Sequence, residues 1–280
     1  MTLSPVPTRS AWPTDRRITI RDLQAATDRG EKWAMLTSYD TQTAGVMERA
    51  GVRALLVGDT SGMTVLGHPD TIAVTMDQMI PMVQAVVRGT DTALVVADLP
   101  FGSYQNGPKQ ALANATRHLK EGGAHAVKLE GGGRTRNQVR RLVDAGIPVM
   151  AHLGLTPQSV NVLGGMRRIQ GRGEAGDQLL ADALALEAAG AFALVLESVP
   201  ADLGNRVTKE LHIPTVGIGA GRHCDAQIMV WQDLAGLTPG RLPKFVKRYA
   251  DLDQILGDAF AEYATEVAEG RYPDDDHSYS

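Results

Sequence analysis

Short apolar runs alternate with amphipathic segments along most of this chain of 280 residues. The runs are nearly continuous rather than strictly alternating, which is typical of strands covered on both faces of a parallel sheet. We therefore expect a strand at each run, the last of which is the weakest. The expected strands are Trp33–Tyr39, Ala54–Gly58, Ala93–Leu99, Ala126–Leu129, Pro148–Leu153, Ala193–Leu196, Pro214–Ile218 and Gln227–Trp231.

Segments with helical periodicity lie between these runs, and several end at a glycine that can form a C-terminal cap. The expected helices are Thr43–Ala50, Met76–Val87, Pro108–Glu121, Arg136–Asp144, Gly176–Ala189, Ala201–Leu211 and one or two within Lys244–Ala268. The glycines at helix ends are Gly51, Gly89, Gly122, Gly146 and Gly190. Seven or eight strand–helix units favour a single α/β fold, the (β/α)8 TIM barrel, over an open doubly wound sheet.

The N-terminal residues differ from the rest of the chain. Prolines interrupt Met1–Arg17, so we expect a flexible or loosely attached arm over residues 1–17. Thr19 offers an N-cap to a short helix, Ile20–Asp28, which Gly30 can close. Residues 18–280 are then predicted to form one barrel, the catalytic domain.

Composition excludes several classes of protein. The net charge is −4 and no strongly basic run occurs, so the chain lacks the electrostatic footprint of a nucleic-acid-binding protein. Cys224 is the only cysteine, so neither an internal disulfide nor a cysteine-based zinc site is expected. No apolar stretch approaches the ~20 residues of a membrane span, and the N-terminus does not resemble a signal peptide. We expect no membrane partner and, by default, a cytoplasmic location.

Ionisable residues end most of the expected strands. A single Asp after a strand is more often a helix cap or turn former than a ligand. In a barrel, however, these strand ends converge on one mouth, where several buried carboxylates would repel one another. A hard divalent cation such as Mg²⁺ removes that cost. The residues at the predicted mouth are Asp40, Asp59, Asp98, Lys128, Glu130, His152 and Glu197.

Two of these residues have open alternatives. Lys128 and Glu130 lie two apart on one strand and so face the same side. Lys128 could form a structural ion pair or hold an anionic substrate, and we favour the second. His152 could be a buried histidine bonded to the backbone or a functional residue. Two further segments, the long polar Thr156–Arg172 and the glycine-rich Gly217–Gly221, indicate a lid or cosubstrate loop and a close approach to a ligand.

At this point the residues match a known family. The chain resembles ketopantoate hydroxymethyltransferase, also named 3-methyl-2-oxobutanoate hydroxymethyltransferase, from about Ile18 to Tyr279. So many matches in the same order are far more specific than one short motif. The matching segments are Leu36–Asp40, Leu56–Asp59, Ala97–Phe101, Val127–Gly132, His152–Val160, Gln170–Arg172, Leu196–Pro200 and Gly217–Gly221.

The resemblance implies a barrel of the phosphoenolpyruvate/pyruvate type. It also implies Mg²⁺, the substrate 3-methyl-2-oxobutanoate and the cosubstrate 5,10-methylenetetrahydrofolate. The product is 2-dehydropantoate, on the route to pantothenate, formed through a Mg-stabilised enolate. Members assemble as homo-oligomers, often homodecamers, so the implied partners are the oxo acid, the folate and further copies of the chain.

The family's functional residues carry over to this chain by motif. Asp59, Asp98 and Glu130 match the metal ligands or hold the waters of the metal. Asp59, Thr60, Asp98 and Lys128 match contacts to the oxo acid, and we predict that His152 binds this substrate as well. Glu197 matches the proton acceptor, although the residues alone leave His152 as a rival base.

Three departures from the family pattern concern the surroundings of the site. Thr60 stands where the family usually has Ser, Met166–Ile169 carries one residue more than expected, and Ala226 stands where Gly is usual. None removes a predicted ligand or the predicted base. Two alternatives stay open: a Mg-dependent C–C lyase or mutase of the same superfamily, which would not need folate, and a barrel that binds small molecules without catalysis.

Overall fold

The computed structural model describes residues 12–165 and 169–280. The chain divides into two compact units, Met1–Met229 and Val230–Ser280. The predicted extra residue within Met166–Ile169 lies largely outside the described residues, as does most of the predicted arm. The predicted limits of the arm and of the catalytic domain stay predictions.

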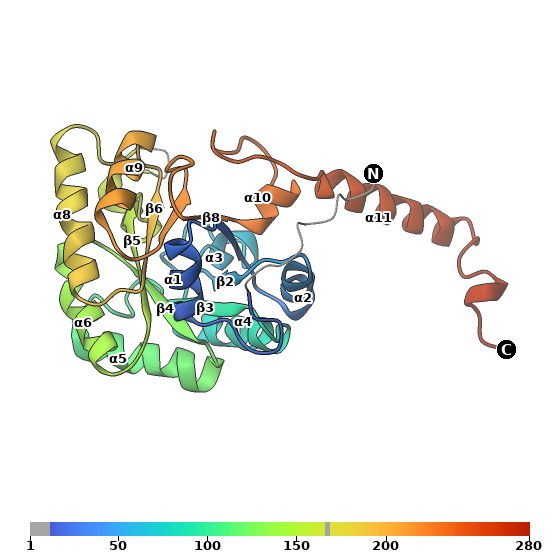
Figure 1. Cartoon of the computed structure of the whole chain (residues 1–280). Helices are drawn as coiled ribbons and strands as arrows, with labels where there is room; N and C mark the ends of the chain where they lie inside the picture. Colours follow the sequence, from blue (N-terminus) through green and yellow to red (C-terminus); the bar gives the residue numbers. More distant parts are fainter. Residues whose placement is uncertain (1–11, 166–168) are drawn as a thin grey trace. The chain divides into compact units, whose positions relative to one another are not determined.

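The first unit is a closed barrel in which each strand pairs in parallel with the next and β8 pairs with β1. This arrangement confirms the expected (β/α)8 fold class. Figure 1 shows the strands at the centre of this unit, with the helices outside them. The strands are β1 Trp33–Thr37, β2 Ala54–Val57, β3 Leu94–Asp98, β4 Ala126–Glu130, β5 Val149–Gly154, β6 Ala193–Glu197, β7 Thr215–Ile218 and β8 Ala226–Met229.

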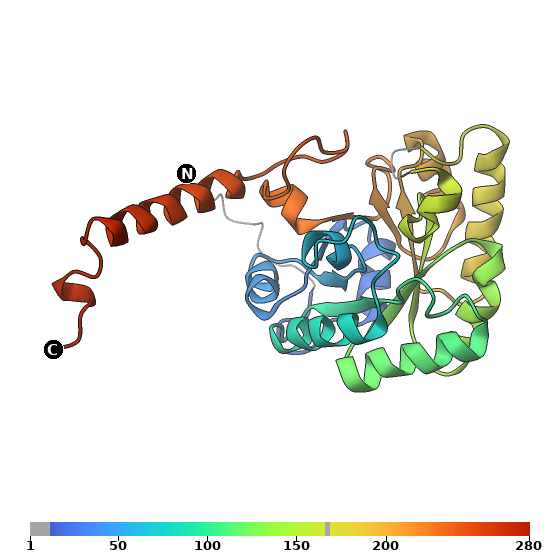
Figure 2. The ribbon, with the colours of Figure 1, turned by 180° about the vertical axis from the view of Figure 1, so that it is seen from behind.

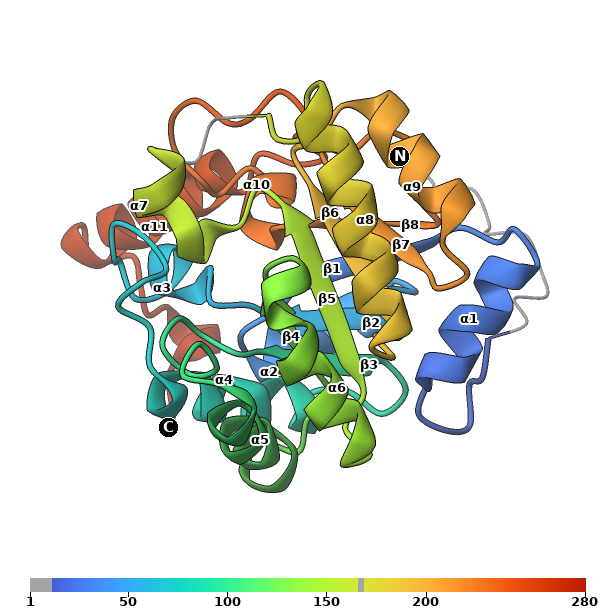
Figure 3. The same ribbon diagram turned by 90° about the vertical axis from the view of Figure 1, so that its left-hand side faces the viewer.

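Helices cover the outer face of the barrel, as the view from behind also shows (Figure 2). In Figure 3, β5 is visible between α6 and α8, and both helices contact it. The α-helices of this unit are α1 Ile20–Asp28, α2 Thr41–Arg49, α3 Ser61–Thr64, α4 Met76–Arg88, α5 Pro108–Arg117, α6 Arg136–Asp144, α7 Val160–Leu163, α8 Glu174–Ala188 and α9 Ala201–Glu210. Single turns of other helix types are η1 His118–Gly122, η2 Gly133–Thr135 and η3 Pro157–Ser159.

The expected helix Pro108–Glu121 changes type before its end. Its α-helical part stops at Arg117, and His118–Gly122 continues as a π-helical turn. Consequently Gly123, with φ of 78°, is the C-terminal cap that we expect at Gly122. Gly89 is the C-terminal cap of α4, as expected, with φ of −83°. The short helices α3 and α7 are not among the predicted helices, because a helix of four residues is too short to show helical periodicity.

Helix α1 closes the N-terminal end of the barrel. Its Thr19 cap forms the reciprocal capping box with Asp22, as the position of a Thr before an amphipathic segment predicts. Trp12 and Leu23 belong to the same buried cluster as the interior strand residues. Arg17 donates hydrogen bonds to the carbonyls of Thr90 and Ala93, so residues 12–17 are held against the barrel.

Alternate strand positions point into the barrel. Leu94 and Val96 on β3, and Ala193 and Val195 on β6, belong to the interior cluster. Continuing each series by two residues gives Asp98 on β3 and Glu197 on β6. The same parity on β4 and β5 leads from Ala126 to Lys128 and Glu130 and from Met150 to His152. The apolar interior therefore ends in polar side chains at the C-terminal end of the barrel, where active sites of this fold lie.

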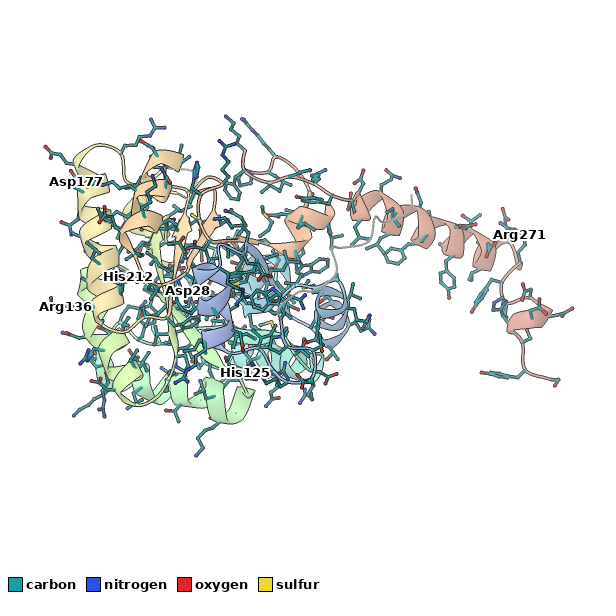
Figure 4. All side chains as sticks on the ribbon, viewed as in Figure 1. Asp28, His125, Arg136, Asp177, His212 and Arg271 are labelled. Atoms are coloured by element: carbon teal, nitrogen blue, oxygen red, sulfur yellow. The ribbon has the colours of Figure 1, made fainter. Side chains whose placement is uncertain are left out.

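The second unit contains α10 Trp231–Ala235, an irregular stretch, α11 Leu252–Ala268 and the turn η4 Asp275–His277. The sequence pattern over Lys244–Ala268 therefore gives one helix, which begins at Leu252. After α11, Arg271 pairs with Glu266 and Glu269 at 2.8 and 2.7 Å (Figure 4). Across residues 12–165 and 169–280, no helix combines the length and apolar character needed to span a membrane.

Candidate active site

Strand register brings the predicted site residues together in pairs. Asp98 is the register partner of Lys128, and Glu130 is the partner of His152. On the next pair of strands, Gly154 is the partner of Glu197. Asp59 follows β2 and donates its main-chain N–H to Oδ2 of Asp98 at 3.3 Å. Of the seven residues predicted at the mouth, all except Asp40 thus form one cluster over β2 to β6. Asp40 caps the N-terminus of α2 instead.

Lys128 provides the principal countercharge at the centre of the cluster. Its Nζ lies 2.8 Å from both carboxylate oxygens of Asp98 and 3.7 Å from Oε1 of Glu130. Burial lowers the pKa of Lys128, but the carboxylates of Asp98 and Glu130 outweigh burial, so the pKa lies above its usual value. The structural ion pair that the sequence left as an alternative is therefore present, and the shared facing of Lys128 and Glu130 is confirmed.

Asp59 is the carboxylate with the least compensation. It is 2 % exposed, and its Oδ2 accepts a hydrogen bond of 2.8 Å from Nε2 of Gln158. Among the described residues, no cationic group lies within ion-pair distance of Asp59. Burial, then repulsion by Asp98 and Glu130, raises the pKa of Asp59 well above the usual Asp value. Burial also raises the pKa of Asp98, against the attraction of Lys128.

His152 lies between two glutamates. Its Nδ1 is 3.3 Å from Oε1 of Glu130, and its Nε2 is 3.3 Å from Oε2 of Glu197. Burial and Lys128 act to lower the pKa of His152, but the two glutamates overcome them and raise it to about 9. Burial acts to raise the pKa of Glu130, but His152 and Lys128 hold it below its usual value. His152 is thus a second countercharge, not a histidine bonded to the backbone.

The donor set of this cluster suits a hard divalent cation. Three buried carboxylates face Lys128 and His152, and Asp59 is left with a neutral donor. Within the part of the chain that is described, no group of three or more His, Cys, Asp or Glu side chains converges on one point as a ready ligand shell. Mg²⁺ needs no such shell, because one or two carboxylates, waters and substrate oxygens commonly complete its coordination. Asp59 and Asp98 could supply these one or two carboxylates, because the main-chain N–H of Asp59 lies 3.3 Å from Oδ2 of Asp98.

Other predicted features lie at or near the mouth with different contacts. Thr60 precedes α3, is partly exposed and makes no side-chain cap to that helix. Two glycines of Gly217–Gly221 are packed against the chain itself: a Cβ on Gly217 would press on Cys224, and one on Gly221 would meet Ala201. Internal packing thus explains these two glycines, and the close approach of the segment to a ligand stays a prediction.

The backbone around Glu197 is unusual. Ser198, the next residue, has φ of 50°, a left-handed conformation that L side chains rarely adopt. Gly154, with φ of 93°, lies so close that a Cβ there would overlap the carbonyl oxygen of Glu197. The same carbonyl accepts the main-chain N–H of Leu155 at 2.8 Å. Strained residues of this kind are concentrated at functional sites.

Three buried polar residues of the site were not singled out from the sequence. Gln158 contacts Asp59, and the hydroxyl of Tyr104 lies 2.7 Å from Oε1 of Gln158. His118 lies 2.8 Å from the carbonyl oxygen of Asp98 through Nε2, and burial lowers its pKa to about 4. Being neutral, His118 donates from Nε2 to that carbonyl. Their signal in the sequence was weak, since a Gln in a loop and a His in a helix are usually exposed.

Comparisons with known proteins agree on one family. Residues 17–275 match the family model described as ketopantoate hydroxymethyltransferase. A 3-methyl-2-oxobutanoate hydroxymethyltransferase of Frankia casuarinae is 63 % identical over 273 residues, covering 98 % of this chain and 92 % of the relative. An enzyme of the same name from Thermobifida fusca is 58 % identical and covers 99 % of both chains.

Solved structures show the same fold at low identity. A phosphonopyruvate hydrolase complexed with oxalate and Mg²⁺ is 14 % identical, with a TM-score of 0.60 and coverage of 94 % of this chain and 92 % of that chain. A 2,3-dimethylmalate lyase of the PEP mutase/isocitrate lyase superfamily is 16 % identical, with a TM-score of 0.60 and coverage of 93 % and 89 %.

Proposed function

This chain belongs to the ketopantoate hydroxymethyltransferase family, and from that premise we propose that it converts 3-methyl-2-oxobutanoate to 2-dehydropantoate with 5,10-methylenetetrahydrofolate and Mg²⁺. The family is one of enzymes, and the relatives' shared name supports a step of pantothenate biosynthesis. The substrate is taken from the relatives' shared name, and the cosubstrate is what the family resemblance implies. The metal is supported by the buried carboxylates of the site.

The accessibility of Glu197 carries this proposal. Its side chain is 17 % exposed, whereas those of Lys128, Asp98, Glu130 and His152 are 5 % exposed or less. Glu197 is thus the ionisable side chain of the cluster that is most open to an incoming molecule. A carboxylate beside a buried cationic cluster can take a proton from carbon when the negative charge that develops is stabilised nearby. We assign Glu197 as the base that removes the C3 proton.

His152 is poorly placed to be that base. Each of its ring nitrogens lies 3.3 Å from a glutamate oxygen. Burial acts to lower the pKa of the ring, but these glutamates raise it to about 9, so both nitrogens carry a proton near neutral pH. A proton acceptor needs a free lone pair directed at the substrate. The contacts support a different role, in which His152 holds Glu197 in place and contributes positive charge at the mouth.

The substrate carboxylate needs positive and neutral donors. Lys128 supplies a buried ammonium group, and Thr60, which directly follows Asp59 in the sequence, carries a hydroxyl group. We propose that Lys128 and Thr60 orient the oxo acid, with Asp59 and Asp98 close to its oxygens. The extra methyl group of Thr60 relative to Ser leaves this hydrogen-bonding capacity intact.

Asp59 and Asp98 are the proposed ligands of Mg²⁺, with Glu130 holding its waters. When bound, the ion would offset the charge of these carboxylates and withdraw electron density from the 2-oxo acid, which makes the C3 proton more acidic. Its arrival would also offset the repulsion that, after burial, raises the pKa of Asp59.

The chemistry balances with one water. Glu197 takes the C3 proton, and the resulting enolate carbon forms a bond to the methylene carbon of the cosubstrate. Both bonds from that carbon to the two folate nitrogens break, and water supplies the hydroxyl group of 2-dehydropantoate. The proton taken from C3 and one proton of the water end on the two nitrogens, which gives tetrahydrofolate. Burial of the cluster below Glu197 limits competing protonation by solvent.

Product analysis tests this function directly. The purified chain is incubated with 3-methyl-2-oxobutanoate and Mg²⁺, with and without 5,10-methylenetetrahydrofolate. We expect 2-dehydropantoate only when the folate is present. Cleavage or rearrangement of an oxo acid without folate would support the lyase or mutase alternative, and no turnover at all would support the binding barrel. Assembly as a homo-oligomer stays a prediction that sedimentation can test.

A further inference from the structure

We propose that Gln158 is a positioning residue that ties the turn after β5 to two active-site carboxylates, an inference that rests on the proposed role of Asp59 and Glu130. Gln158 lies in η3, Pro157–Ser159, and is 4 % exposed. Because it contacts Asp59 through its side chain and Glu130 through its main chain, one residue outside the strands sets the position of both.

The side-chain amide of Gln158 has one possible orientation. Its neighbour Leu99 offers a main-chain carbonyl, which can only accept, so Nε2 must face it, at 2.9 Å. The other hydrogen of Nε2 then points to Oδ2 of Asp59, at 2.8 Å. This orientation leaves Oε1 as an acceptor for the hydroxyl of Tyr104, at 2.7 Å.

The hydroxyl of Tyr104 supports this orientation of the Gln158 amide. Its hydroxyl is buried, and it accepts the main-chain N–H of Glu130 at 3.1 Å. Its own hydrogen has two acceptors in reach, Oε1 of Gln158 at 2.7 Å and the carbonyl oxygen of Glu130 at 3.0 Å, and the contact to Gln158 is the shorter. The main-chain N–H of Gln158 donates to Oε2 of Glu130 at 3.0 Å, which closes a ring of contacts through Tyr104, Gln158 and Glu130.

The charge of the site explains why a neutral donor is required at residue 158. A carboxylate there would add a fourth negative charge beside Asp59 and face the carbonyl of Leu99. A lysine would pair with Asp59 and supply the charge that we assign to Mg²⁺. An amide satisfies Asp59 without neutralising it, so Asp59 stays available to a cation.

The central variant is Gln158→Met, which has the same length but removes the amide and keeps the main-chain N–H. Gln138→Met is the matched control, because Gln138 is also buried but donates to the carbonyl of Tyr104 and not to a carboxylate. Two readouts are independent of turnover: hydrogen exchange of segment 157–163 by mass spectrometry, and calorimetric titration with MgCl₂ alone.

We expect Gln158→Met to speed amide exchange in segment 157–163 and to weaken Mg²⁺ binding at least about 10-fold, the usual range for a lost partner of a ligand. Gln138→Met should change neither. Tyr104→Phe, which leaves every Asp59 contact in place, should give the same pattern at smaller size and serves if Gln158→Met does not fold.

Unchanged exchange and unchanged Mg²⁺ affinity in Gln158→Met would overturn the inference. A kinetic comparison separates the roles further, since a positioning residue should lower kcat for C3 hydrogen exchange more than it raises KM for the oxo acid. If the wild-type chain neither binds Mg²⁺ nor exchanges that hydrogen, the proposed function fails. The exchange of segment 157–163 then still decides whether Gln158 holds the turn.

Discussion

The Nε2 atom of His152 lies 3.3 Å from Oε2 of Glu197. The other ring nitrogen faces Glu130, so one imidazole connects the proposed base to the buried carboxylate cluster. This relationship explains how Glu197 can be more exposed than its neighbours and still have a defined position. The two candidate bases therefore have different roles: Glu197 is the proposed base, and His152 holds Glu197 in position.

Removal of Lys128 should destabilise the fold. Lys128→Met would leave Asp98 buried beside Asp59 and Glu130 without its ammonium partner, and losing one member of a buried pair typically costs about 3–5 kcal/mol. We expect that loss in urea-induced unfolding without Mg²⁺. The double variant Lys128→Met/Asp98→Asn should recover most of it. If Lys128→Met unfolds at the wild-type urea concentration, Lys128 serves substrate binding alone.

Replacement of Asp59 should have opposite effects on stability and on metal binding. Burial and repulsion raise the pKa of Asp59, so its ionisation opposes folding at neutral pH. In EDTA, Asp59→Asn should raise the free energy of unfolding by on the order of 1 kcal/mol. In MgCl₂, the wild-type melting temperature should rise and that of the variant should not.

The exposed Asp177 on α8 gives the matched control (Figure 4). Asp177→Asn removes the same charge from the surface and should keep the response to MgCl₂. A similar MgCl₂ response in Asp59→Asn and in the wild-type chain would exclude Asp59 as a ligand.

His125 should make stability depend on pH below neutrality. Burial, then the charge of Arg17, lowers the pKa of His125 to about 4, and its Nδ1 accepts the main-chain N–H of Val95 at 3.1 Å. Because the folded-state pKa is depressed below about 6.5, the unfolded chain takes up the proton first. The stabilisation is therefore complete above about pH 6.5 and is lost as the pH falls towards about 4.

His125→Asn isolates this contribution, since an amide oxygen can replace Nδ1 as acceptor without titrating. Between pH 7 and pH 4, the wild-type free energy of unfolding should fall by about 2 kcal/mol more than that of the variant, after allowance for partial exposure. His118, whose pKa is also lowered, contributes equally to both proteins. Parallel pH profiles would contradict the assignment.

Gly154→Ala tests the close approach to Glu197. The new Cβ would overlap the carbonyl oxygen of Glu197, in addition to the strain at φ of 93°. Gly146 is the control, with φ of 82° and open space where a Cβ would lie. We expect Gly146→Ala to cost about 1 kcal/mol from backbone strain and Gly154→Ala at least about 2 kcal/mol more. Equal losses in thermal unfolding would show that Glu197 moves aside freely.

Much of the fold could be predicted because buried parallel strands have a distinct sequence pattern. The strand ends were correct to within about two residues, and they placed Asp98, Glu130 and Glu197 at one end of the barrel. The pairing of Glu130 with His152 depends on strand register, which the apolar pattern does not specify for strands buried on both faces.

The contacts of Gln158 and His118 could not be predicted for a different reason. Gln158 reaches Asp59 across 99 positions of the sequence, and its turn has too few residues to show periodicity. The burial of His118 depends on a π-helical turn, which extends a helix that appears regular in the sequence. Both depend on tertiary packing and not on local preference.

Exchange of the C3 hydrogen of 3-methyl-2-oxobutanoate with deuterated solvent tests the central claim most directly, because it reports proton removal without the folate. The wild-type chain with Mg²⁺ should exchange this hydrogen. Glu197→Gln keeps the shape of the side chain, should still bind the oxo acid, and should lose exchange by a factor on the order of 10² or more. His152→Asn should retain much more of it. Exchange at the wild-type rate in Glu197→Gln would contradict the account and make His152 the leading candidate for the base.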